Sequence, residues 1–250
     1  MSPVAPPAAF EAIDVRKAYR DVIALDGVSL TVAAGECLAI VGESGSGKTT
    51  LLHLFNRLVE PDAGSVLAGG EDVAAHDPIA LRRRIGYVPQ TGGLLPHWNV
   101  LRNVALVPWL ERHADPEGAA RSALELVGLA PDTFAQRRPA ELSGGQRQRV
   151  AIARALAIQP RYLLLDEAFS ALDAITRGDV HEAFLNIRRK LPVTTLLVTH
   201  DLREAVVLAD RTAVLRRGRL EHVGPTREVV AAPATPYVAE LIRKSGVTVS

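Results

Sequence analysis

The sequence predicts an α/β protein with a mostly parallel β-sheet, an antiparallel β subdomain and an inserted α-helical subdomain. Strand-like and helix-like segments alternate through most of the chain, which is typical of α/β folds. Residues 37–41 form an uninterrupted apolar run, as expected for a strand buried on both faces of a parallel sheet. Between about residues 91 and 159 the strand pattern is absent and helical patterns follow one another, which predicts the helical insertion.

The first part of the chain predicts two antiparallel strands, over residues 12–19 and 28–32, with a turn near Asp26-Gly27. A third strand is expected over residues 36–41. A Gly-rich loop follows it, and then a helix over about residues 48–58 that ends at the turn Glu60-Pro61-Asp62.

The remaining elements are expected in three groups. A strand over 85–88 precedes helical segments over 99–111, 116–128 and 145–158, which Pro108, Pro116 and Pro131 interrupt. Strands return at 162–166 and 194–199 with a helix over about 176–190 between them, and residues 226–244 predict short helices. We expect residues 1–10 to be a disordered lead, residues 11–245 to form one domain with its helical subdomain at about 91–159, and residues 246–250 to be a tail.

Composition excludes several classes of protein. The 29 basic and 28 acidic residues give a formal net charge of +1, which does not favour a general electrostatic grip on nucleic acid or on an anionic bilayer. The single cysteine, Cys37, excludes an internal disulfide framework and a cysteine-based zinc site. The apolar runs are shorter than the ~20 residues of a membrane span, and the first residues lack the features of a signal peptide. We therefore expect a soluble intracellular protein.

Residues 42–50, GESGSGKTT, fit the pattern G-x-x-x-x-G-K-[ST] of a phosphate-binding loop, or P-loop. Gly45 and Gly47 let the backbone turn so that successive N–H groups point at phosphate oxygens. A flexible Gly/Ser loop is the alternative, but this loop follows a buried strand and opens a helix, as a P-loop does. Lys48 is expected to reach the β- and γ-phosphates and Thr49 to ligate Mg²⁺. The expected nucleotide-binding residues of the loop are Gly42, Glu43, Ser44, Gly45, Ser46, Gly47, Lys48, Thr49 and Thr50.

A second acidic element lies downstream. Residues 162–167, YLLLDE, form an apolar strand that ends in two carboxylates. An exposed acidic turn would be the ordinary explanation, but the same chain contains a P-loop. We therefore expect Asp166 to serve Mg²⁺ and Glu167 to activate the attacking water.

Residues 142–146, LSGGQ, indicate the family. They resemble the signature of ATP-binding-cassette (ABC) proteins, and they stand between the P-loop and the acidic strand, as in that family. A serine hydroxyl and glycine N–H groups at the start of a helix form a second anion site, which predicts nucleotide contacts for Ser143, Gly144, Gly145 and Gln146. The resemblance covers about residues 11–245 and implies a P-loop NTPase core that binds and hydrolyses ATP with Mg²⁺.

Further residues match the family pattern in the expected order. Tyr19 resembles the aromatic residue that stacks on adenine, although an ordinary strand tyrosine is the alternative. Gln90 resembles the glutamine that meets Mg²⁺ and the attacking water, and Asp173 belongs to a segment, SALD, similar to the D-loop. His200, directly after an apolar strand, resembles the switch histidine that contacts the γ-phosphate. The family commonly has proline where this chain has Ala168, a difference that affects a turn rather than the chemistry.

The resemblance implies an assembly. Two copies are expected to pack head to tail, so that each γ-phosphate lies between Lys48 of one copy and Ser143 and Gly145 of the other. Three roles compete: a transporter ATPase, a soluble ABC protein acting on ribosomes or DNA, and a regulator without turnover. A single cassette without a long heptad stretch argues against the second role, and the presence of Glu167 and His200 argues against the third.

The transporter reading implies integral membrane permease subunits, a location at the cytoplasmic face of the membrane and, indirectly, a substrate-binding protein. Residues 81–109 and 173–177 are similar to the cassettes of importers for osmoprotectants such as glycine betaine, choline, carnitine or proline. Amino-acid importers are the alternative. We expect the segment Leu95-Pro96-His97-Trp98 to receive the coupling helix of the permease, although a locally buried Trp98 would also explain it.

Overall fold

The computed structural model describes residues 8–247, which separate into two compact units. The first unit comprises the chain up to Arg82 together with the chain from Thr194 onward, and the second comprises Arg83–Val193. The second unit is larger than the helical subdomain expected at 91–159, because it also includes the strand before that subdomain and the strand and long helix after it.

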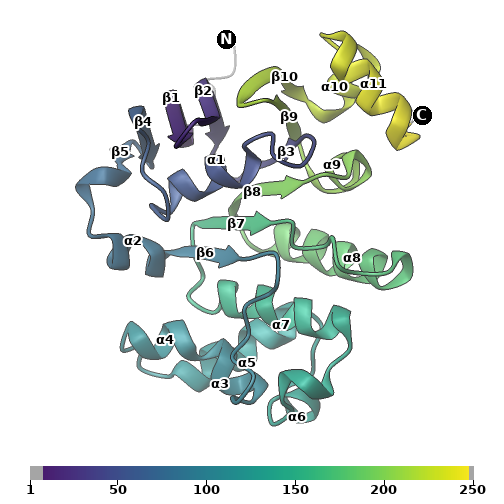
Figure 1. Cartoon of the computed structure of the whole chain (residues 1–250). Coiled ribbons are helices and arrows are strands. Elements are labelled where there is room, and N and C mark those ends of the chain that lie inside the picture. Colours follow the sequence, from purple (N-terminus) through teal and green to yellow (C-terminus); the bar gives the residue numbers. More distant parts are fainter. Residues whose placement is uncertain (1–7, 248–250) are drawn as a thin grey trace, which may run out of the picture. The chain divides into compact units, whose positions relative to one another are not determined.

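The first unit begins with an antiparallel sheet (Figure 1). Its strands are β1 (Ala8–Tyr19), β2 (Val22–Ala33), β4 (Ala63–Ala68) and β5 (Glu71–Asp72), in the order β2-β1-β4-β5. The antiparallel β subdomain is thus confirmed. The boundary expected for the disordered lead is wrong at residues 8–10, because they belong to β1 and the Phe10 side chain is fully buried. The rest of that predicted lead lies outside the described residues.

The expected turn at Asp26-Gly27 is also wrong. The chain reverses at Arg20-Asp21, and Asp26 and Gly27 lie within β2. Pairing of β1 with β2 shifts register between Val15↔Val28 and Lys17↔Leu25, so the Asp-Gly pair forms an irregularity in the strand rather than its end.

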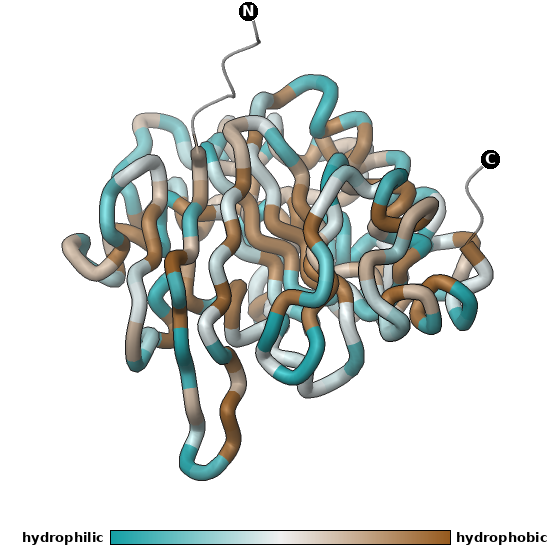
Figure 2. The backbone as a smooth tube through the Cα atoms, turned by 90° about the horizontal axis from the view of Figure 1, so that it is seen from above, coloured by the Kyte–Doolittle hydropathy of each residue, from teal (hydrophilic) through white to brown (hydrophobic). Residues whose placement is uncertain are grey.

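A second group of strands forms the parallel core of this unit. β3 (Cys37–Val41) pairs in parallel with β8 (Thr194–Thr199) and with β9 (Arg211–Arg216), and β10 (Arg219–Pro225) pairs antiparallel with β9. Every residue of β3 and β8 is buried, as the apolar runs predicted. Figure 2 shows hydrophobic colour along the strands and hydrophilic colour in many of the loops.

The helices of the first unit are short. They are α1 (Lys48–Phe55), the 3₁₀ turn η1 (Val73–Ala75), α9 (Leu202–Leu208), α10 (Thr226–Ala231) and α11 (Pro236–Ser245), and α2 (Pro78–Arg84) crosses the boundary between the units. α1 ends three residues before the expected position because Arg57 adopts a left-handed φ of 52°. α11 packs Val238 against Val214 and Val229.

The second unit contains two parallel strands and most of the helices (Figure 1). Its strands, β6 (Ile85–Val88) and β7 (Tyr162–Asp166), pair directly. Its helices are α3 (Val100–Val104), α4 (Leu106–Leu110), α5 (Pro116–Leu126), α6 (Pro131–Phe134), the 3₁₀ turn η2 (Pro139–Glu141), α7 (Gly144–Leu156) and α8 (Ala174–Lys190). The helical insertion is confirmed. The prolines do not interrupt helices as expected: Pro116 and Pro131 start α5 and α6, where a missing N–H has no partner to lose.

Candidate nucleotide site

The P-loop connects β3 to α1 in the first unit, and its glycines are required by the local backbone. Gly45 and Gly47 have φ values of 77° and 105°, in the left-handed region that side chains disfavour. A Cβ on Gly42 would overlap the carbonyl oxygen of Leu215, and one on Gly47 would overlap that of Ala24. The pattern G-x-x-x-x-G-K therefore fits both the loop conformation and its close packing.

Lys48 and Ser46 give the loop its anion-binding character. The Lys48 side chain is buried, and its Nζ donates to the carbonyl oxygens of Gly42 at 2.9 Å and Glu43 at 2.8 Å, so the ammonium group lies within the curve of the loop. The Ser46 hydroxyl is buried and has no hydrogen-bond partner among residues 8–247. A buried hydroxyl and a buried cation beside the start of a helix fit a phosphate group. Thr49, the next residue of α1, is exposed, as a Mg²⁺ ligand at this position must be.

Tyr19, the expected adenine platform, is the last residue of β1 and is 46% exposed. The Lys17 ammonium lies 5.6 Å from the centre of its ring. An exposed ring beside a cation can stack a planar base, so the arrangement is compatible with the expected role.

His200 directly follows β8 and is exposed. The turn that carries it is fixed by buried hydrogen bonds: the Thr199 hydroxyl donates to the Glu204 carboxylate at 2.6 Å and accepts from the Asp201 N–H at 3.0 Å. Asp201 in turn caps α9. Sequence reasoning missed Thr199 and Glu204, although an acidic residue four positions after a histidine at a strand end was the available signal.

Gln90 and Glu167 meet in the second unit. Gln90 Nε2 donates to Glu167 Oε2 at 3.1 Å. Gln90 lies two residues after the end of β6, and Glu167 directly follows β7, the strand that pairs with β6 in parallel. Glu167 has a left-handed φ of 46°, which is uncommon for glutamate. Residues in such strained backbone conformations are frequent at functional sites. Ser170 holds it there, because the Ser170 N–H and hydroxyl both donate to the Glu167 carbonyl oxygen. Ser170 was noted in the sequence only as part of the D-loop segment.

Asp166, the last residue of β7, is buried. It lies close enough to Tyr87 of β6 to influence its ionisation: burial, and secondarily the Asp166 charge, raise the pKa of Tyr87 to about 12. A carboxyl group at the end of a strand offers oxygen ligands at a fixed place, which suits a Mg²⁺ site.

The signature segment opens α7 with a reciprocal capping box. The Ser143 hydroxyl accepts from the Gln146 N–H at 3.2 Å, and the Gln146 side chain accepts from the Ser143 N–H at 3.0 Å. Ser143 and Gly144 are exposed, whereas Gly145 is buried where a Cβ would overlap Cγ2 of Thr176. The exposed serine at a helix start leaves this segment open to a partner molecule.

Asp173, the expected D-loop residue, caps α8 by accepting from the Thr176 N–H at 3.1 Å. Hydrogen bonds from the Thr176 side chain and backbone hold the pKa of Asp173 below its usual value. Its carboxylate is therefore ionised at physiological pH and is engaged in the cap.

The segment after Gln90 is attached to the signature helix. Arg154 of α7 donates to the carbonyl oxygens of Gly93 at 2.6 Å and Gly92 at 2.8 Å, a pair of contacts that sequence reasoning missed. Further along, Leu95 is 39% exposed, and Trp98 is half-buried with the Arg102 guanidinium 4.1 Å from its ring centre. The surroundings of Trp98 are therefore compatible with both local packing and a role in an interface.

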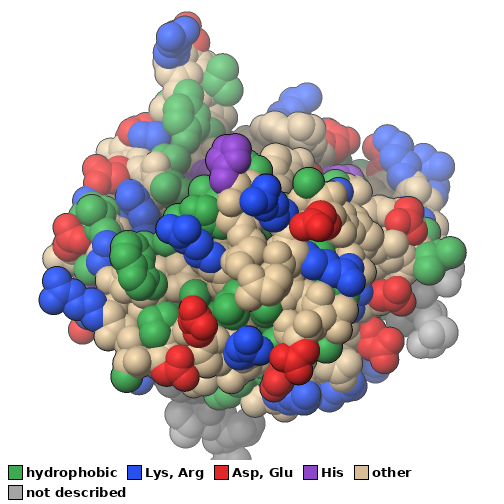
Figure 3. Space-filling model, turned by 90° about the horizontal axis from the view of Figure 1, so that it is seen from below, with side chains coloured by type: hydrophobic (Ala, Val, Ile, Leu, Met, Phe, Trp, Pro, Cys, Tyr) green, Lys and Arg blue, Asp and Glu red, His purple; other side chains and the backbone are tan. Residues whose placement is uncertain are grey.

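The surface and the helices give two further observations. On the face shown in Figure 3, Lys and Arg side chains intermingle with Asp and Glu side chains. Within residues 8–247, no helix has both the length and the apolar character needed to cross a bilayer.

Comparisons with known proteins identify the family of the chain. A family model described as "ABC transporter" matches residues 25–170, more than half of the chain. The glycine betaine/carnitine/choline transport ATP-binding protein OpuCA of Bacillus subtilis is 43% identical over 88% of this chain and 58% of its own length. The Fe(3+) ions import ATP-binding protein FbpC 1 of Rhodococcus jostii is 46% identical over 94% of this chain and 67% of its own length.

The chain thus spans less than two thirds of the length of OpuCA. Among solved structures, the dimeric post-hydrolysis state of the ATP-binding cassette MJ0796 bound to ADP and Pi is similar, with 32% identity and a TM-score of 0.78 over 87% of this chain and 98% of that one. Matched motifs, sequence and fold lead to one conclusion: the chain belongs to the ABC transporter family.

Proposed function

We propose that the chain is the ATP-binding and ATP-hydrolysing subunit of an ABC importer. The observation that carries the proposal is the P-loop, in which the buried Lys48 ammonium and the buried Ser46 hydroxyl stand at the start of α1. Within the part of the chain that the structure describes, that hydroxyl has no hydrogen-bond partner. These groups fit a triphosphate, and Thr49 and Asp166 are the oxygen donors that Mg²⁺ prefers. The relative MJ0796, described with ADP and Pi, supports the same chemistry.

The roles follow from each residue's surroundings. Lys48 binds the phosphates and neutralises their charge, while Tyr19 offers its ring to the adenine. Mg²⁺, when bound, neutralises charge that develops on the phosphate oxygens. Glu167 takes a proton from the attacking water, and Gln90 orients the Glu167 carboxylate through their hydrogen bond. His200, on its rigid turn, contacts the γ-phosphate.

The assembly we propose has a second copy of the chain, packed head to tail, that presents Ser143 and Gly145 to the nucleotide. The exposed Ser143 at the start of α7 and the dimeric state of MJ0796 support it. Permease subunits would hold the dimer at the cytoplasmic face of the membrane and contact the segment that includes Leu95 and Trp98. A substrate-binding protein would deliver the solute to the permease.

The proposed solute is a quaternary-ammonium or similar compatible solute, such as glycine betaine, choline or proline. OpuCA supports this class, whereas the name of FbpC 1 refers to a different solute at similar identity. Uptake of labelled betaine, choline and proline, measured in high-osmolarity medium with and without this subunit, tests the assignment. Deletion should reduce uptake of at least one of them. If uptake of all three were unchanged and the cells instead lost uptake of an amino acid or of Fe(3+), the solute would be reassigned. The ATPase role would remain in place.

A further inference from the structure

The turn between β9 and β10 contacts the P-loop through its backbone. The Gly218 N–H donates to the carbonyl oxygen of Ser46 at 2.9 Å, and the Gly218 carbonyl accepts from the Asp26 N–H at 2.9 Å. Gly218 therefore lies between the phosphate loop and the irregular part of β2. Its φ is 76°, and a Cβ would stand only 2.8 Å from the Ala24 carbonyl oxygen, so glycine is required at this position.

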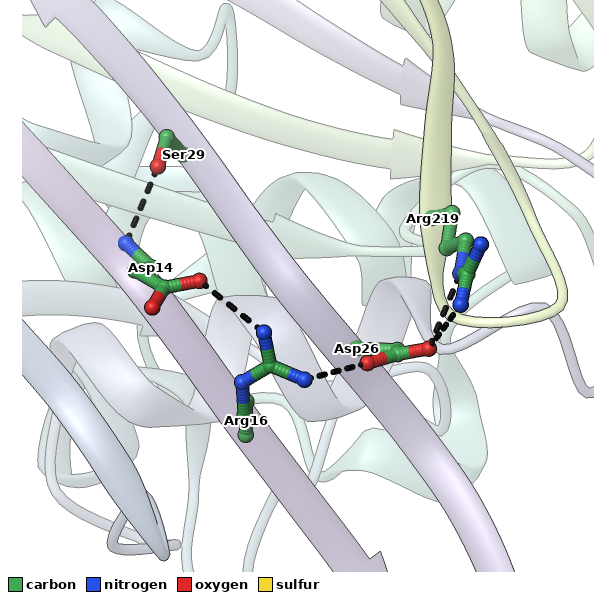
Figure 4. A network of polar contacts seen from close by, with 5 residues as sticks. All are labelled: Asp14, Arg16, Asp26, Ser29 and Arg219. Carbon is green, nitrogen blue, oxygen red and sulfur yellow. Dashed lines mark hydrogen bonds and ion pairs between the residues drawn. The ribbon is translucent and has the colours of Figure 1, made fainter.

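A side-chain network holds this turn in place (Figure 4). Asp26 Oδ2 accepts from Arg219 Nε at 2.9 Å and Nη2 at 2.6 Å, and Asp26 Oδ1 accepts from Arg16 at 2.7 Å. The carboxylate is 20% exposed and lies between an arginine of β1 and an arginine of β10. The hydrogen bonds from Arg219 hold the pKa of Asp26 below its usual value, so its charge persists at physiological pH.

The Ser46 carbonyl matters because it belongs to the same peptide group as the Gly47 N–H. A trans peptide is planar, so its C=O and N–H bonds point in opposite directions. When the Gly218 N–H fixes the direction of the Ser46 carbonyl, it also fixes the direction of the Gly47 N–H. Gly47 is the P-loop glycine at the start of α1, where backbone N–H groups bind anions.

We propose that Asp26 and Arg219 are positioning residues for the phosphate loop: they hold the β9–β10 turn so that Gly218 directs the Gly47 N–H toward a phosphate oxygen of the nucleotide. This inference rests on the proposed function, because it assumes that a nucleotide occupies the P-loop. It adds two residues from outside the family motifs to the determinants of nucleotide affinity.

The chain offers a matched control in Asp14. Its carboxylate also pairs with Arg16, at 3.4 Å, in the same network, but among the described residues it makes no hydrogen bond or ion pair with Arg219 or Gly218. Asp26→Asn and Asp14→Asn are thus the same chemical change at two positions of one network. Arg219→Gln removes the ion pair with Asp26 from its other side. The Arg219 side chain is 72% exposed, so its replacement does not threaten the fold.

The experiment measures two quantities for the full chain. Isothermal titration calorimetry gives the Kd for MgATP, and the amide ¹⁵N resonance of Gly47 in nucleotide-free protein reports on its peptide group. Asp26→Asn and Arg219→Gln should each raise the Kd by about fivefold, the upper effect of losing a solvent-facing ion pair, and should shift the Gly47 resonance. Asp14→Asn should change neither quantity.

Three results would overturn the inference: an unchanged Kd in both test variants, a changed Kd without a Gly47 shift, or an equal effect of Asp14→Asn. A network that only stabilised the fold would lower the melting temperature and leave the Kd and the resonance unchanged, which is the first of these results. Failure of the proposed function looks different, since wild-type protein would then not bind MgATP, or Lys48→Ala would bind it equally well. In that case, the Gly47 resonance of the Asp26→Asn protein would still test whether Asp26 fixes the Gly47 peptide group.

Discussion

The Gln90 side chain donates a hydrogen bond to the Glu167 carboxylate across 3.1 Å, which joins the residues that follow two neighbouring parallel strands. Glu167 is held at a left-handed φ by Ser170, so its backbone and its side chain are each fixed by a separate partner. This double restraint is what a water-activating carboxylate requires, because general-base catalysis depends on the position of the base.

Glu167→Gln should keep ATP binding and lose most turnover. Lys48 and Thr49, the P-loop residues proposed to bind the phosphates and Mg²⁺, are unchanged, whereas an amide cannot accept the proton of the attacking water. Loss of a general base lowers the rate by ~10²–10⁴-fold. Steady-state phosphate release measures the rate, and Glu182→Gln, at an exposed carboxylate of α8, is the control that should hydrolyse ATP normally. Turnover near the wild-type value in the Glu167 variant would exclude Glu167 as the base.

Thr199→Val should destabilise the turn that carries His200. The Thr199 hydroxyl is buried, donates to the buried Glu204 carboxylate at 2.6 Å and accepts from Asp201. Removing it from a buried pair lowers the free energy of unfolding by about 1–3 kcal/mol. Urea denaturation monitors the change, and Thr199→Ser, which keeps the hydroxyl, should lose much less. Because valine keeps the methyl group and replaces only the hydroxyl, wild-type stability in Thr199→Val would contradict a stabilising role of the Thr199 hydroxyl.

Gly145→Ala and Gly144→Ala should differ sharply although they are neighbours in the signature segment. A Cβ on Gly145 would overlap Cγ2 of Thr176, whereas a Cβ on Gly144 would meet Leu172 at an ordinary 3.6 Å. Overpacking of this kind lowers stability by about 1–3 kcal/mol. Thermal unfolding should show the loss for Gly145→Ala alone, and Thr176→Ser, which removes the methyl group, should restore part of it. Equal stability of the two alanine variants would contradict this close contact.

The sequence predicted the parts of the fold in which local pattern and burial agree. The strand expected over 85–88 coincides with β6, and the helical insertion and most expected strands are confirmed. The turn predicted at Asp26-Gly27 was wrong because the same dipeptide suits both a turn and an irregular strand. Only the pairing with β1 distinguishes the two. The β9–β10 hairpin was not predicted, because β9 begins and ends in arginine and β10 begins with one, and these residues resemble loop residues.

The candidate site was predicted from motifs, whereas the residues that position it were not. The P-loop, Gln90, Glu167 and Ser143 each stand in a recognisable string of residues. Arg154 and Asp26 do not, because each acts on a backbone or side chain brought near it only by folding. An arginine that donates to carbonyl oxygens 61 and 62 positions away leaves no local pattern in the sequence.

The signature serine provides the test of the proposed dimer. With MgATP, the Glu167→Gln protein should elute as a dimer on gel filtration, since bound nucleotide that is not hydrolysed keeps both copies together. Ser143 is exposed at the start of α7, so Ser143→Arg, made in the Glu167→Gln protein, places a bulky side chain where the partner's γ-phosphate is proposed to lie without disturbing the core. This second change should abolish the dimer. Ser122→Arg, at an exposed serine of α5, is the matched control and should leave the dimer intact, because it adds the same side chain away from the anion site. An undisturbed dimer in the Ser143→Arg protein would place the signature segment outside the interface.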